Sequence, residues 1–396
     1  MEKSNHVKVS NIKDADIYII NACTAVGKEF EKNLKKIKEV GNKTIIYTGC
    51  VLEGEKEELK EVKDVKVLNS RNLSDWEKEA PFPVSSFGSN IDEKFQENKW
   101  KASIPIMDGC DQFCSYCAVP FARGREIYYP IKDIVNYAEK LINSGYKEIS
   151  LTGSNILSYK PSFTQLVKRI NDIDGDFWIK VNYFSLNKNI SDDFLDSLAS
   201  CDKFLPTMTI PLQSGSDRML KLMNRNYTSD KFLEFIQKVK KKMPEAYIRT
   251  EVIVGFPGEE NEDVKKTIRV LRKMSPDDII LYSFSSRPKT KAAKMDGEIS
   301  KKEKIRRKKT IMNSLKETIM KNNKRLIGKK TDFIPYSNQS RKGGYVLGTI
   351  KEGIVAINKS NKIKPEKIKI KNVTSIENKD FNYSKKIFLV EGFSEN

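Results

Sequence analysis

The chain has 396 residues, 38% of them hydrophobic, which is enough for well-packed cores and too long for one ordinary domain. The formal net charge of +19 favours a polyanionic partner, RNA or DNA rather than a membrane, with a lysine-rich composition of every surface as the alternative. The sequence shows no secretory signal and no apolar run long enough to span a bilayer. We therefore expect a cytoplasmic protein whose cysteines stay reduced and bind metal. The single histidine, His6, argues against chemistry that needs a histidine base or histidine ligands.

Residues 1–75 alternate strands and helices. Residues 16–20, 44–47 and 65–68 are apolar runs typical of strands, and an amphipathic helix lies between the first two. This order predicts a small parallel α/β sheet. Cys23 and Cys50 each follow the C-terminal end of a strand, the edge where such sheets bind ligands. We interpret the pair as a site, with two isolated buried cysteines as the alternative.

Residues 76–100 contain prolines, paired serines and a glycine, and we interpret them as a linker to a second domain that begins at residue 101. From there strands and helices alternate at a longer period. The predicted strands are residues 148–151, 177–183, 207–210, 247–254 and 279–283, and the predicted helices include residues 130–143, 191–200, 230–242 and 262–274. Five or six βα units predict a full or partial barrel.

Polar loops follow three of these strands. Residues 152–155, 211–216 and 255–260 each contain a glycine, which allows a close backbone approach to a ligand. Each loop alone fits ordinary turn chemistry. Because active sites of such barrels gather at the C-terminal strand ends, the three loops together predict a binding site there.

Residues 299–326 predict a strongly basic helix with an apolar face at Ile305, Met312, Leu315 and Ile319. Seven basic residues crowd its start: Lys301, Lys302, Lys304, Arg306, Arg307, Lys308 and Lys309. We interpret the helix as a phosphate-contacting brace between domains, with a solvated packing helix as the alternative.

Residues 327–392 change to short β-rich runs separated by glycine and asparagine. They predict a small antiparallel barrel of about five strands, a fold that often binds RNA. The predicted strands are residues 331–335, 345–350, 353–357 and 367–370. We expect little regular structure in the tail from Asn378 onward.

One loop near the centre of the chain holds three cysteines. Cys110, Cys114 and Cys117 follow the pattern C-x-x-x-C-x-x-C, with no fourth cysteine and no histidine nearby. A closed zinc site usually has four ligands, whereas three thiolates on a four-iron cluster leave one iron open for a substrate or cofactor. The spacing favours such a cluster. A three-cysteine zinc site and chance clustering are the alternatives.

The stretch around this loop, residues 107–126, closely resembles the signature of the radical S-adenosylmethionine (SAM) methylthiotransferases. Further blocks resemble the same family, at residues 21–24, 48–50, 210–217, 223–228, 253–259 and 285–288. The N-terminal sheet resembles the family's flavodoxin-like domain, and the C-terminal barrel resembles its TRAM domain, an RNA-binding module. The resemblance covers almost the whole chain.

The resemblance implies that Cys110, Cys114 and Cys117 hold a [4Fe-4S] cluster whose open iron binds SAM and whose electron cleaves SAM to a 5′-deoxyadenosyl radical. It also implies an auxiliary cluster at Cys23 and Cys50 that supplies or carries sulfur, and a second SAM that supplies the methyl group. The residues expected to cradle SAM, through backbone donors and polar side chains, are Gly153, Ser154, Asn155, Gly255 and Gly258. We expect a monomer that takes electrons from a donor such as flavodoxin or ferredoxin.

The family acts on adenosine 37 of tRNA or on an aspartate of a ribosomal protein, and the basic charge favours tRNA. Residues 108–125 look most like the branch that methylthiolates C2 of N6-threonylcarbamoyladenosine, with the N6-isopentenyladenosine branch as the runner-up. Base 37 would have to be splayed out of its stack to reach the radical.

The sequence departs from the family pattern at its N-terminus. The family has a first strand and a first cysteine upstream of the block at residue 21, so the domain looks truncated and only two of its three cysteines are present. The spare Cys201 is interpreted as structural. Three hypotheses follow: a true start further upstream, an auxiliary cluster that is lost or completed by another ligand, or an RNA-binding remnant that cleaves SAM without inserting sulfur. Smaller departures are Thr209, where histidine is frequent, and Lys289, where glycine is frequent.

Overall fold

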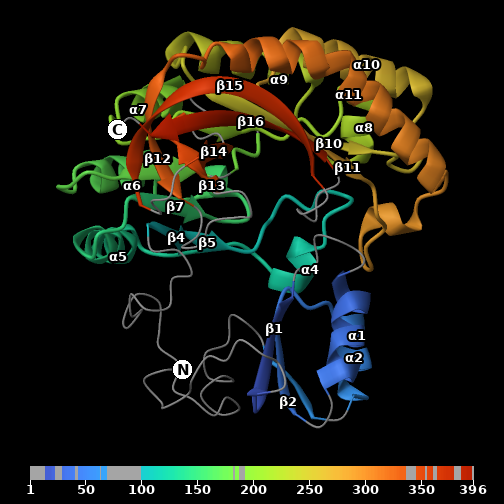
Figure 1. Ribbon diagram of the computed structural model, residues 1–396. Coiled ribbons are helices and arrows are strands. Elements are labelled where there is room, and N and C mark those ends of the chain that lie inside the picture. The colour runs from blue at the N-terminus through green and yellow to red at the C-terminus, as the bar shows by residue number, and fades with distance from the viewer. Residues whose placement is uncertain are drawn as a thin grey trace. The chain divides into compact units, whose positions relative to one another are not determined.

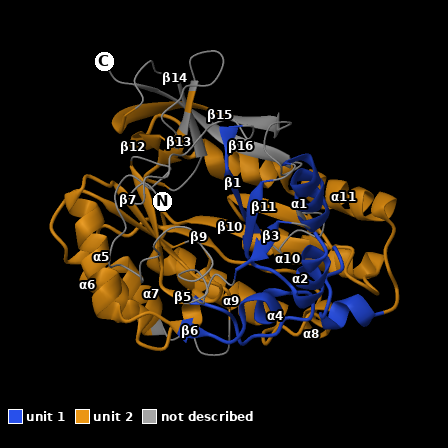
Figure 2. Cartoon of the chain, turned by 90° about the horizontal axis from the view of Figure 1, so that it is seen from below, with its two compact units in different colours: residues 1–91, 108–127, 285–295 blue, residues 92–107, 128–284, 296–396 orange. Residues whose placement is uncertain are grey.

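The computed structural model describes residues 14–22, 29–40, 43–62, 64–68, 100–181, 183–186, 192–335, 345–352, 355–359, 364–378 and 385–394. The chain divides into two compact units, each made of stretches that are far apart in sequence (Figure 2). The first unit comprises Met1–Ile91, Asp108–Ile127 and Ser285–Met295, and the second comprises Asp92–Met107, Tyr128–Phe284 and Asp296–Asn396. The predicted linker, apart from Trp100, lies outside the described residues, so the predicted domain boundaries stay a prediction.

A parallel sheet forms the N-terminal part of the first unit. Its strands are β1 (Ile17–Ala22), β2 (Thr44–Gly49) and β3 (Val65–Val67), in that order, and the helices α1 (Glu29–Val40) and α2 (Glu53–Lys60) connect them (Figure 1). Its core is apolar, with Ile45, Tyr47 and Leu59 almost fully buried. The predicted parallel α/β sheet is confirmed, and its likeness to flavodoxin stays a prediction.

The cysteine loop and a later segment also belong to the first unit. The loop begins at β5 (Met107–Asp108) and leads into the short helix α4 (Val119–Arg123), while the 3₁₀ turn η5 (Lys291–Lys294) comes much later in the chain. The Ala292 amide donates to the Ser115 carbonyl at 2.8 Å, which ties η5 to the loop.

Six parallel strands form the core of the second unit within the described residues. The strands β4 (Lys101–Pro105), β7 (Glu148–Thr152) and β8 (Trp178–Val181) make one sheet, and β9 (Thr207–Thr209), β10 (Tyr247–Val254) and β11 (Asp278–Ser283) make the other. A parallel bridge from Ile179 to Phe204 continues the first sheet toward the second. The predicted α/β core of parallel strands is confirmed, and it positions the polar loops at the C-terminal strand ends.

Helices of the second unit connect these strands or, in the case of α11, follow the last of them. They are α5 (Ile131–Asn143), α6 (Phe163–Asn171), α7 (Asp192–Ala199), α8 (Asp217–Leu222), α9 (Ser229–Lys242), α10 (Asn261–Met274) and α11 (Lys301–Lys324), together with η4 (Ile156–Ser158). Capping side chains explain several starts: the Thr228 hydroxyl accepts from the Lys231 amide before α9, and the Ser300 hydroxyl accepts from the Glu303 amide before α11. The strands β5 and β6 (Ile127–Tyr128) form a separate two-stranded sheet. No helix in the described part of the chain is long and apolar enough to cross a bilayer.

A closed five-stranded barrel forms the C-terminal part of the second unit. Its strands are β12 (Lys330–Pro335), β13 (Tyr345–Ile350), β14 (Val355–Lys359), β15 (Glu366–Asn378) and β16 (Lys385–Ser394), closed in the order β12-β13-β14-β16-β15 (Figure 1). Phe333, Val346 and Ile368 are fully buried in its core.

Two details of the predicted barrel are wrong. The pair β14–β16 is parallel, whereas the other four pairs are antiparallel. The expectation of an irregular tail is contradicted by β16, which lies in that tail and closes the barrel between β14 and β15. The apolar run at residues 387–390 gives this strand its β propensity.

Candidate active site

The cysteine loop of the first unit carries Cys110, Cys114 and Cys117. Cys110 is buried, Cys114 and Cys117 are half-buried, and none of the three forms a disulfide. Gly109, with a φ of 75°, turns the chain into the loop, and the Cys110 amide donates to the Gly124 carbonyl at 3.2 Å. The Cys117 amide donates to the Cys114 carbonyl at 3.0 Å. The loop is therefore closed at its base and turned at its tip.

Charged side chains brace the same loop. The Asp111 amide donates to Glu126 Oε1 at 3.3 Å, and the Glu126 amide donates to Asp111 Oδ1 at 3.2 Å. Arg125 Nε lies 3.0 Å from the same Asp111 oxygen. Arg125 also stacks over the Phe113 ring, 5.3 Å from its centroid. Phe113 takes a left-handed φ of 48°, which these contacts help to hold.

Burial, together with charge on Cys114 and Cys117, raises the pKa of the Cys110 thiol to about 12. Across the described ranges, no three Cys, His, Asp or Glu side chains form a site for a single metal ion. Three cysteines on one braced loop are the ligand set of a cluster held by three cysteines, which takes them as thiolates.

A second sulfur lies elsewhere in the first unit. Cys50 follows β2 and is 5% exposed, and Arg123 Nε lies 2.7 Å from its Sγ atom. The other end of the Arg123 guanidinium, NH1, lies 3.1 Å from Asp108 Oδ1. Burial alone would lower the pKa of Arg123, but the Cys50 sulfur and the Asp108 carboxylate outweigh it and raise that pKa. Cys23, the predicted partner of Cys50, lies outside the described residues.

Buried polar atoms without a partner accompany Cys50 in the first unit. The Thr48 hydroxyl and Arg287 Nε have no hydrogen-bond partner, and both residues are 6% exposed. Glu55 Oε2 accepts the Leu52 amide at 2.8 Å, and the charge of Arg287 acts on Glu55. Because buried polar groups are normally satisfied, these two orphans fit a unit that receives a further polar group. Sequence reasoning missed Arg123, Thr48 and Arg287 as site residues, although all three lie in the motifs that carry the family resemblance.

The first loop predicted to bind SAM, in the second unit, packs closely at its glycine. A Cβ atom on Gly153 would lie 2.5 Å from Met107 Cγ. Ser154 is half-buried, whereas Asn155 is only 3% exposed and its carbonyl accepts the Ser158 amide at 2.9 Å. The structure therefore places all three predicted residues together after β7.

The second loop predicted to bind SAM is shaped by α11. The Gly255 amide donates to Glu259 Oε2 at 2.8 Å, and the Gly258 amide donates to the Gly297 carbonyl at 2.9 Å. Both amides are therefore already bonded within the chain, and the expectation that Gly255 and Gly258 lie at a SAM site stays a prediction. Gly255 leaves room for a side chain of α11, since a Cβ atom there would lie 2.3 Å from Lys304 Cγ.

Two basic residues of α11 support that loop from inside. Arg307 NH1 lies 2.8 Å from Glu259 Oε2, with the two side chains 7% and 4% exposed. Lys304 Nζ donates to the Phe284 carbonyl at 3.1 Å. Burial raises the pKa of Glu259, although Arg307 and the Gly255 amide favour its carboxylate form.

These inward contacts correct the predicted face of α11. Ile305, expected in the apolar face, is 45% exposed. The buried side of the helix is made by Lys304, Arg307, Ile311, Leu315, Ile319 and Asn323. Hydrophobic periodicity correctly predicts Leu315 and Ile319 but misplaces the start of the face by one residue, because Lys304 and Arg307 are buried through their partners.

The loop after β9 is largely structural. Gly215 lies against α10, where a Cβ atom would come within 2.5 Å of Thr267 Cα, and Ser216 Oγ donates to Asp263 Oδ1 at 2.7 Å. Gln213 is the exception: it has a φ of 64°, is 9% exposed, and its Oε1 atom has no partner. This buried acceptor at the strand-end rim is a further residue that could receive a ligand donor.

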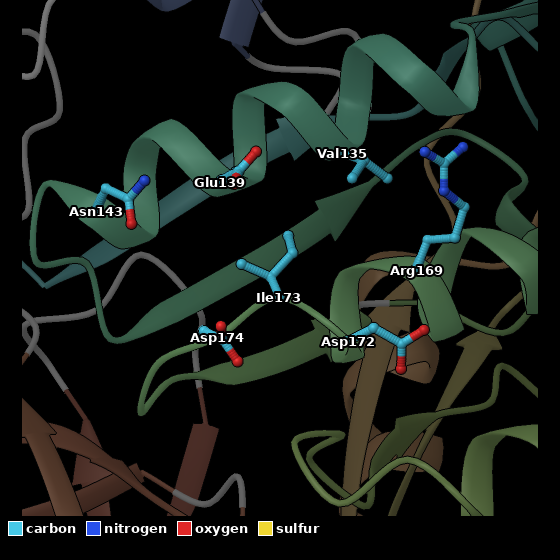
Figure 3. A pocket seen from close by; sticks show the side chains of 7 residues that line it. All are labelled: Val135, Glu139, Asn143, Arg169, Asp172, Ile173 and Asp174. Atoms are coloured by element: carbon cyan, nitrogen blue, oxygen red, sulfur yellow. The ribbon is translucent and has the colours of Figure 1, made fainter.

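Two other features lie apart from these loops. Cys201 is buried after α7, and its Sγ donates to the Ser197 carbonyl at 3.2 Å, in keeping with the structural interpretation. A surface hollow of about 500 Å³ lies between α5 and α6 (Figure 3), lined by Val135, Glu139, Asn143, Arg169, Asp172, Ile173 and Asp174. Because α5 and α6 end there, just before β7 and β8, the hollow lies at the N-terminal strand ends, away from the polar loops.

A row of parallel βα units with a three-cysteine loop defines a class of protein, the radical SAM enzymes. The family model "Radical SAM superfamily" matches residues 104–271, and the model "Uncharacterized protein family UPF0004" matches residues 1–69. A solved radical S-adenosylmethionine methyltransferase from Kitasatospora setae matches with a TM-score of 0.49 and 12% identity, over 71% of this chain and 63% of that chain.

Curated relatives narrow the class to a family. The "tRNA-2-methylthio-N(6)-dimethylallyladenosine synthase" of Clostridium botulinum (strain Okra / Type B1) is 31% identical over 384 residues, covering 89% of this chain and 85% of that protein. The protein of the same name from Thermotoga petrophila is 32% identical over 380 residues, with the same two coverages of 89% and 85%. The "Ribosomal protein uS12 methylthiotransferase RimO" of Thermosipho africanus is 31% identical over 352 residues, covering 83% and 81%. The chain belongs to the radical SAM methylthiotransferase family.

Family membership settles the class of chemistry. The protein is an enzyme that transfers alkylthio groups, and its cofactors are [4Fe-4S] clusters and SAM. The prediction of [4Fe-4S] clusters and SAM as cofactors is confirmed. Which residues hold each cofactor is part of the proposal below.

Proposed function

We propose that this enzyme transfers a methylthio group to C2 of N6-threonylcarbamoyladenosine at position 37 of tRNA. The amino-acid sequence of residues 108–125 supports this substrate, because it most resembles the branch of the family that acts on N6-threonylcarbamoyladenosine. N6-isopentenyladenosine is the second candidate, since the Clostridium and Thermotoga relatives are named as synthases for the dimethylallyl nucleoside. A ribosomal-protein aspartate is the third, on the name of the Thermosipho relative.

The observation that carries the choice of tRNA is where the charge lies. Residues 301–396 contain 25 of the 72 lysines and arginines but only 9 of the 53 aspartates and glutamates, so they carry +16 of the net charge of +19. A uniformly lysine-rich protein would spread this surplus along the whole chain. Its confinement to α11 and the C-terminal barrel supports a polyanion bound by this part of the second unit.

The outer side of α11 presents much of that charge. Its exposed basic residues are Lys301, Lys302, Arg306, Lys309, Lys316, Lys321 and Lys324. The helix also contacts β15 and β16 of the C-terminal barrel, which we propose is a TRAM domain. We infer that phosphates of tRNA are neutralised along this helix, while Lys304 and Arg307 are withdrawn from that role by their internal partners.

Cys110, Cys114 and Cys117 are the proposed ligands of the SAM-binding cluster. Bound there, the cluster supplies the electron for radical chemistry. The chain itself holds three thiols on a braced loop and offers the side chains of Ser154 and Asn155 to SAM, while Gly153 and Gly255 let Met107 and Lys304 pack beside the two loops. Gly258, whose Cβ direction is open space, is kept as a neighbour of SAM rather than as a donor.

Cys50, with Cys23, is the proposed site of the auxiliary cluster that handles sulfur. The alternative is an RNA-binding remnant that cleaves SAM without inserting sulfur. The contact of Arg123 with Cys50 and the orphaned atoms of Thr48 and Arg287 support a working sulfur site. The electron donor of the enzyme is expected to be a flavodoxin or a ferredoxin. The enzyme is expected to work in the cytoplasm, where its tRNA substrate lies.

Mass spectrometry of tRNA nucleosides tests the proposal. tRNA from a strain lacking this gene is compared with tRNA from the same strain carrying it. We expect the methylthio form of N6-threonylcarbamoyladenosine to appear only with the gene. A methylthio form of the isopentenyl nucleoside would establish the second candidate. Unchanged nucleosides would reject tRNA as the substrate and direct the search to ribosomal-protein aspartates.

A further inference from the structure

Arg123 links the two cysteine sites within the first unit. Its Nε atom lies 2.7 Å from Cys50 Sγ, and its NH1 atom lies 3.1 Å from Asp108 Oδ1. The same Asp108 oxygen accepts the Gly109 amide at 2.8 Å, directly before Cys110. One guanidinium thus spans the distance between a buried sulfur after β2 and the base of the three-cysteine loop.

Arg123 differs in this from its neighbour Arg125. Arg125 is 70% exposed in its side chain, and it pairs with Asp111 and stacks on Phe113 at the tip of the loop. Arg123 instead turns its Nε–H toward a sulfur that is 5% exposed. Arg125 therefore lies among exposed charged groups, whereas Arg123 contacts a buried sulfur.

We propose that Arg123 is a positioning residue for the sulfur chemistry at Cys50. Its Nε–H holds the Cys50 sulfur, and Asp108 fixes the guanidinium so that the sulfur keeps one place relative to the cysteine loop. This inference rests on the proposed function in one respect, the assignment of Cys50 to the auxiliary cluster. It adds a residue that neither the motif spacing nor the cysteine count indicates.

The guanidinium has a physical consequence for a cluster bound at Cys50. Hydrogen bonds to cluster or ligand sulfurs raise the reduction potential, because they stabilise the extra negative charge of the reduced form. A cationic donor does so more strongly than a neutral one. Removing the donor should therefore make this cluster harder to reduce, with no requirement that the chain lose iron.

The test uses the full chain with Cys110, Cys114 and Cys117 all changed to alanine, so that only the Cys50 site can hold a cluster. After anaerobic reconstitution, iron and sulfide are counted, and the midpoint potential is found by a redox titration followed by electron paramagnetic resonance. In this background, Arg123→Gln removes the cationic donor and Arg123→Lys keeps the charge. Arg125→Gln, on the same loop, is the matched control.

At the midpoint potential of the parent protein, Arg123→Gln should lower the ratio of reduced to oxidised cluster at least about tenfold. A tenfold change corresponds to a midpoint potential lowered by about 59 mV for a one-electron couple. Arg123→Lys should restore part of this shift, and Arg125→Gln should leave the midpoint unchanged. Equal midpoints in Arg123→Gln and Arg125→Gln would overturn the proposal. Should Arg123→Gln not fold, Asp108→Asn releases the guanidinium and must shift the potential in the same direction by a smaller amount, or the proposal fails.

Iron content separates this proposal from the function on which it rests. Iron bound in the triple-alanine background with no effect of Arg123 overturns the positioning role and leaves Cys50 as a ligand. No iron in any variant of that background overturns both the role of Arg123 and the assignment of Cys50. In that case SAM cleavage by the unmutated chain would still show that the three-cysteine loop works.

Discussion

The two cysteine sites of the first unit are built in different ways. Cys110, Cys114 and Cys117 lie within eight consecutive residues, and their loop is braced by its own side chains such as Asp111 and Glu126. The Cys50 site is assembled from distant parts of the chain, because its contact is made by Arg123. The local site could therefore be recognised from spacing, whereas the assembled site needs the fold to show its components.

The largest expected effect lies at the local site. Cys114→Ala should abolish SAM cleavage, because two thiolates do not replace the three that leave one iron open for SAM. The measurement is 5′-deoxyadenosine formed under reducing conditions. Cys201→Ala, at a buried cysteine outside both sites, is the control and should keep most of the activity. Normal 5′-deoxyadenosine formation by Cys114→Ala would contradict the assignment of the loop.

The next effect separates the assembled site from the local one. Cys50→Ala should keep SAM cleavage and lose methylthiolated product, because the sulfur site is distinct from the SAM site. Both products are measured in one reaction by chromatography with mass spectrometry. A Cys50→Ala enzyme that forms methylthio product at the original rate would show that this cysteine takes no part.

A third test concerns the loop that α11 supports in the second unit. Arg307→Met leaves Glu259 buried without its partner and should cost about 3–5 kcal/mol of unfolding free energy, together with a raised KM for SAM. Denaturant unfolding and SAM-dependent kinetics measure the two effects. Arg306→Met removes an adjacent exposed arginine, whose surface pair with Glu303 is screened by solvent, so this variant should lose little stability. Equal losses in the two variants would refute the supporting role of Arg307.

A fourth test concerns the outer side of the same helix. The double variant Lys309→Gln with Lys316→Gln should reduce the salt dependence of tRNA binding by about 1.4 to 1.8 in the slope of log K against log salt. The variant Lys132→Gln with Lys140→Gln changes two exposed lysines of α5 and is the control. Binding is measured by filter retention or anisotropy over a salt series. An equal change of slope in both double variants would mean that α11 is not a preferred phosphate contact.

The smallest effect concerns the departure at Lys289. This residue takes a left-handed φ of 65°, which explains why glycine is frequent at this position in the family. Lys289→Gly should therefore stabilise the chain by up to about 1 kcal/mol, seen as a higher unfolding midpoint. A destabilised variant would show that the lysine side chain makes a contact worth more than the strain.

Much of the fold followed from hydrophobic patterns. The predicted helices at 230–242 and 262–274 begin within one residue of α9 and α10, and the predicted strand at 247–254 coincides with β10. These elements are long and have one periodic apolar face, so local sequence decides them.

What could not be predicted depends on contacts between distant residues. The buried side of α11 includes Lys304 and Arg307 because their partners Phe284 and Glu259 come from other parts of the chain. The strand β16 was missed because its pairing with β14 and β15 is what orders it. The same holds for the candidate site: the three-cysteine loop was visible as a motif, whereas the role of Arg123 depends on a contact across 73 residues of sequence.

The central claim is that the chain holds two clusters with separate tasks, and counting iron tests it most directly. Anaerobically reconstituted wild-type protein should contain about eight irons per chain, and the variant with Cys110, Cys114 and Cys117 changed to alanine should contain about four. About four irons in the wild type and none in the variant would contradict the account, because the Cys50 site would then hold no cluster.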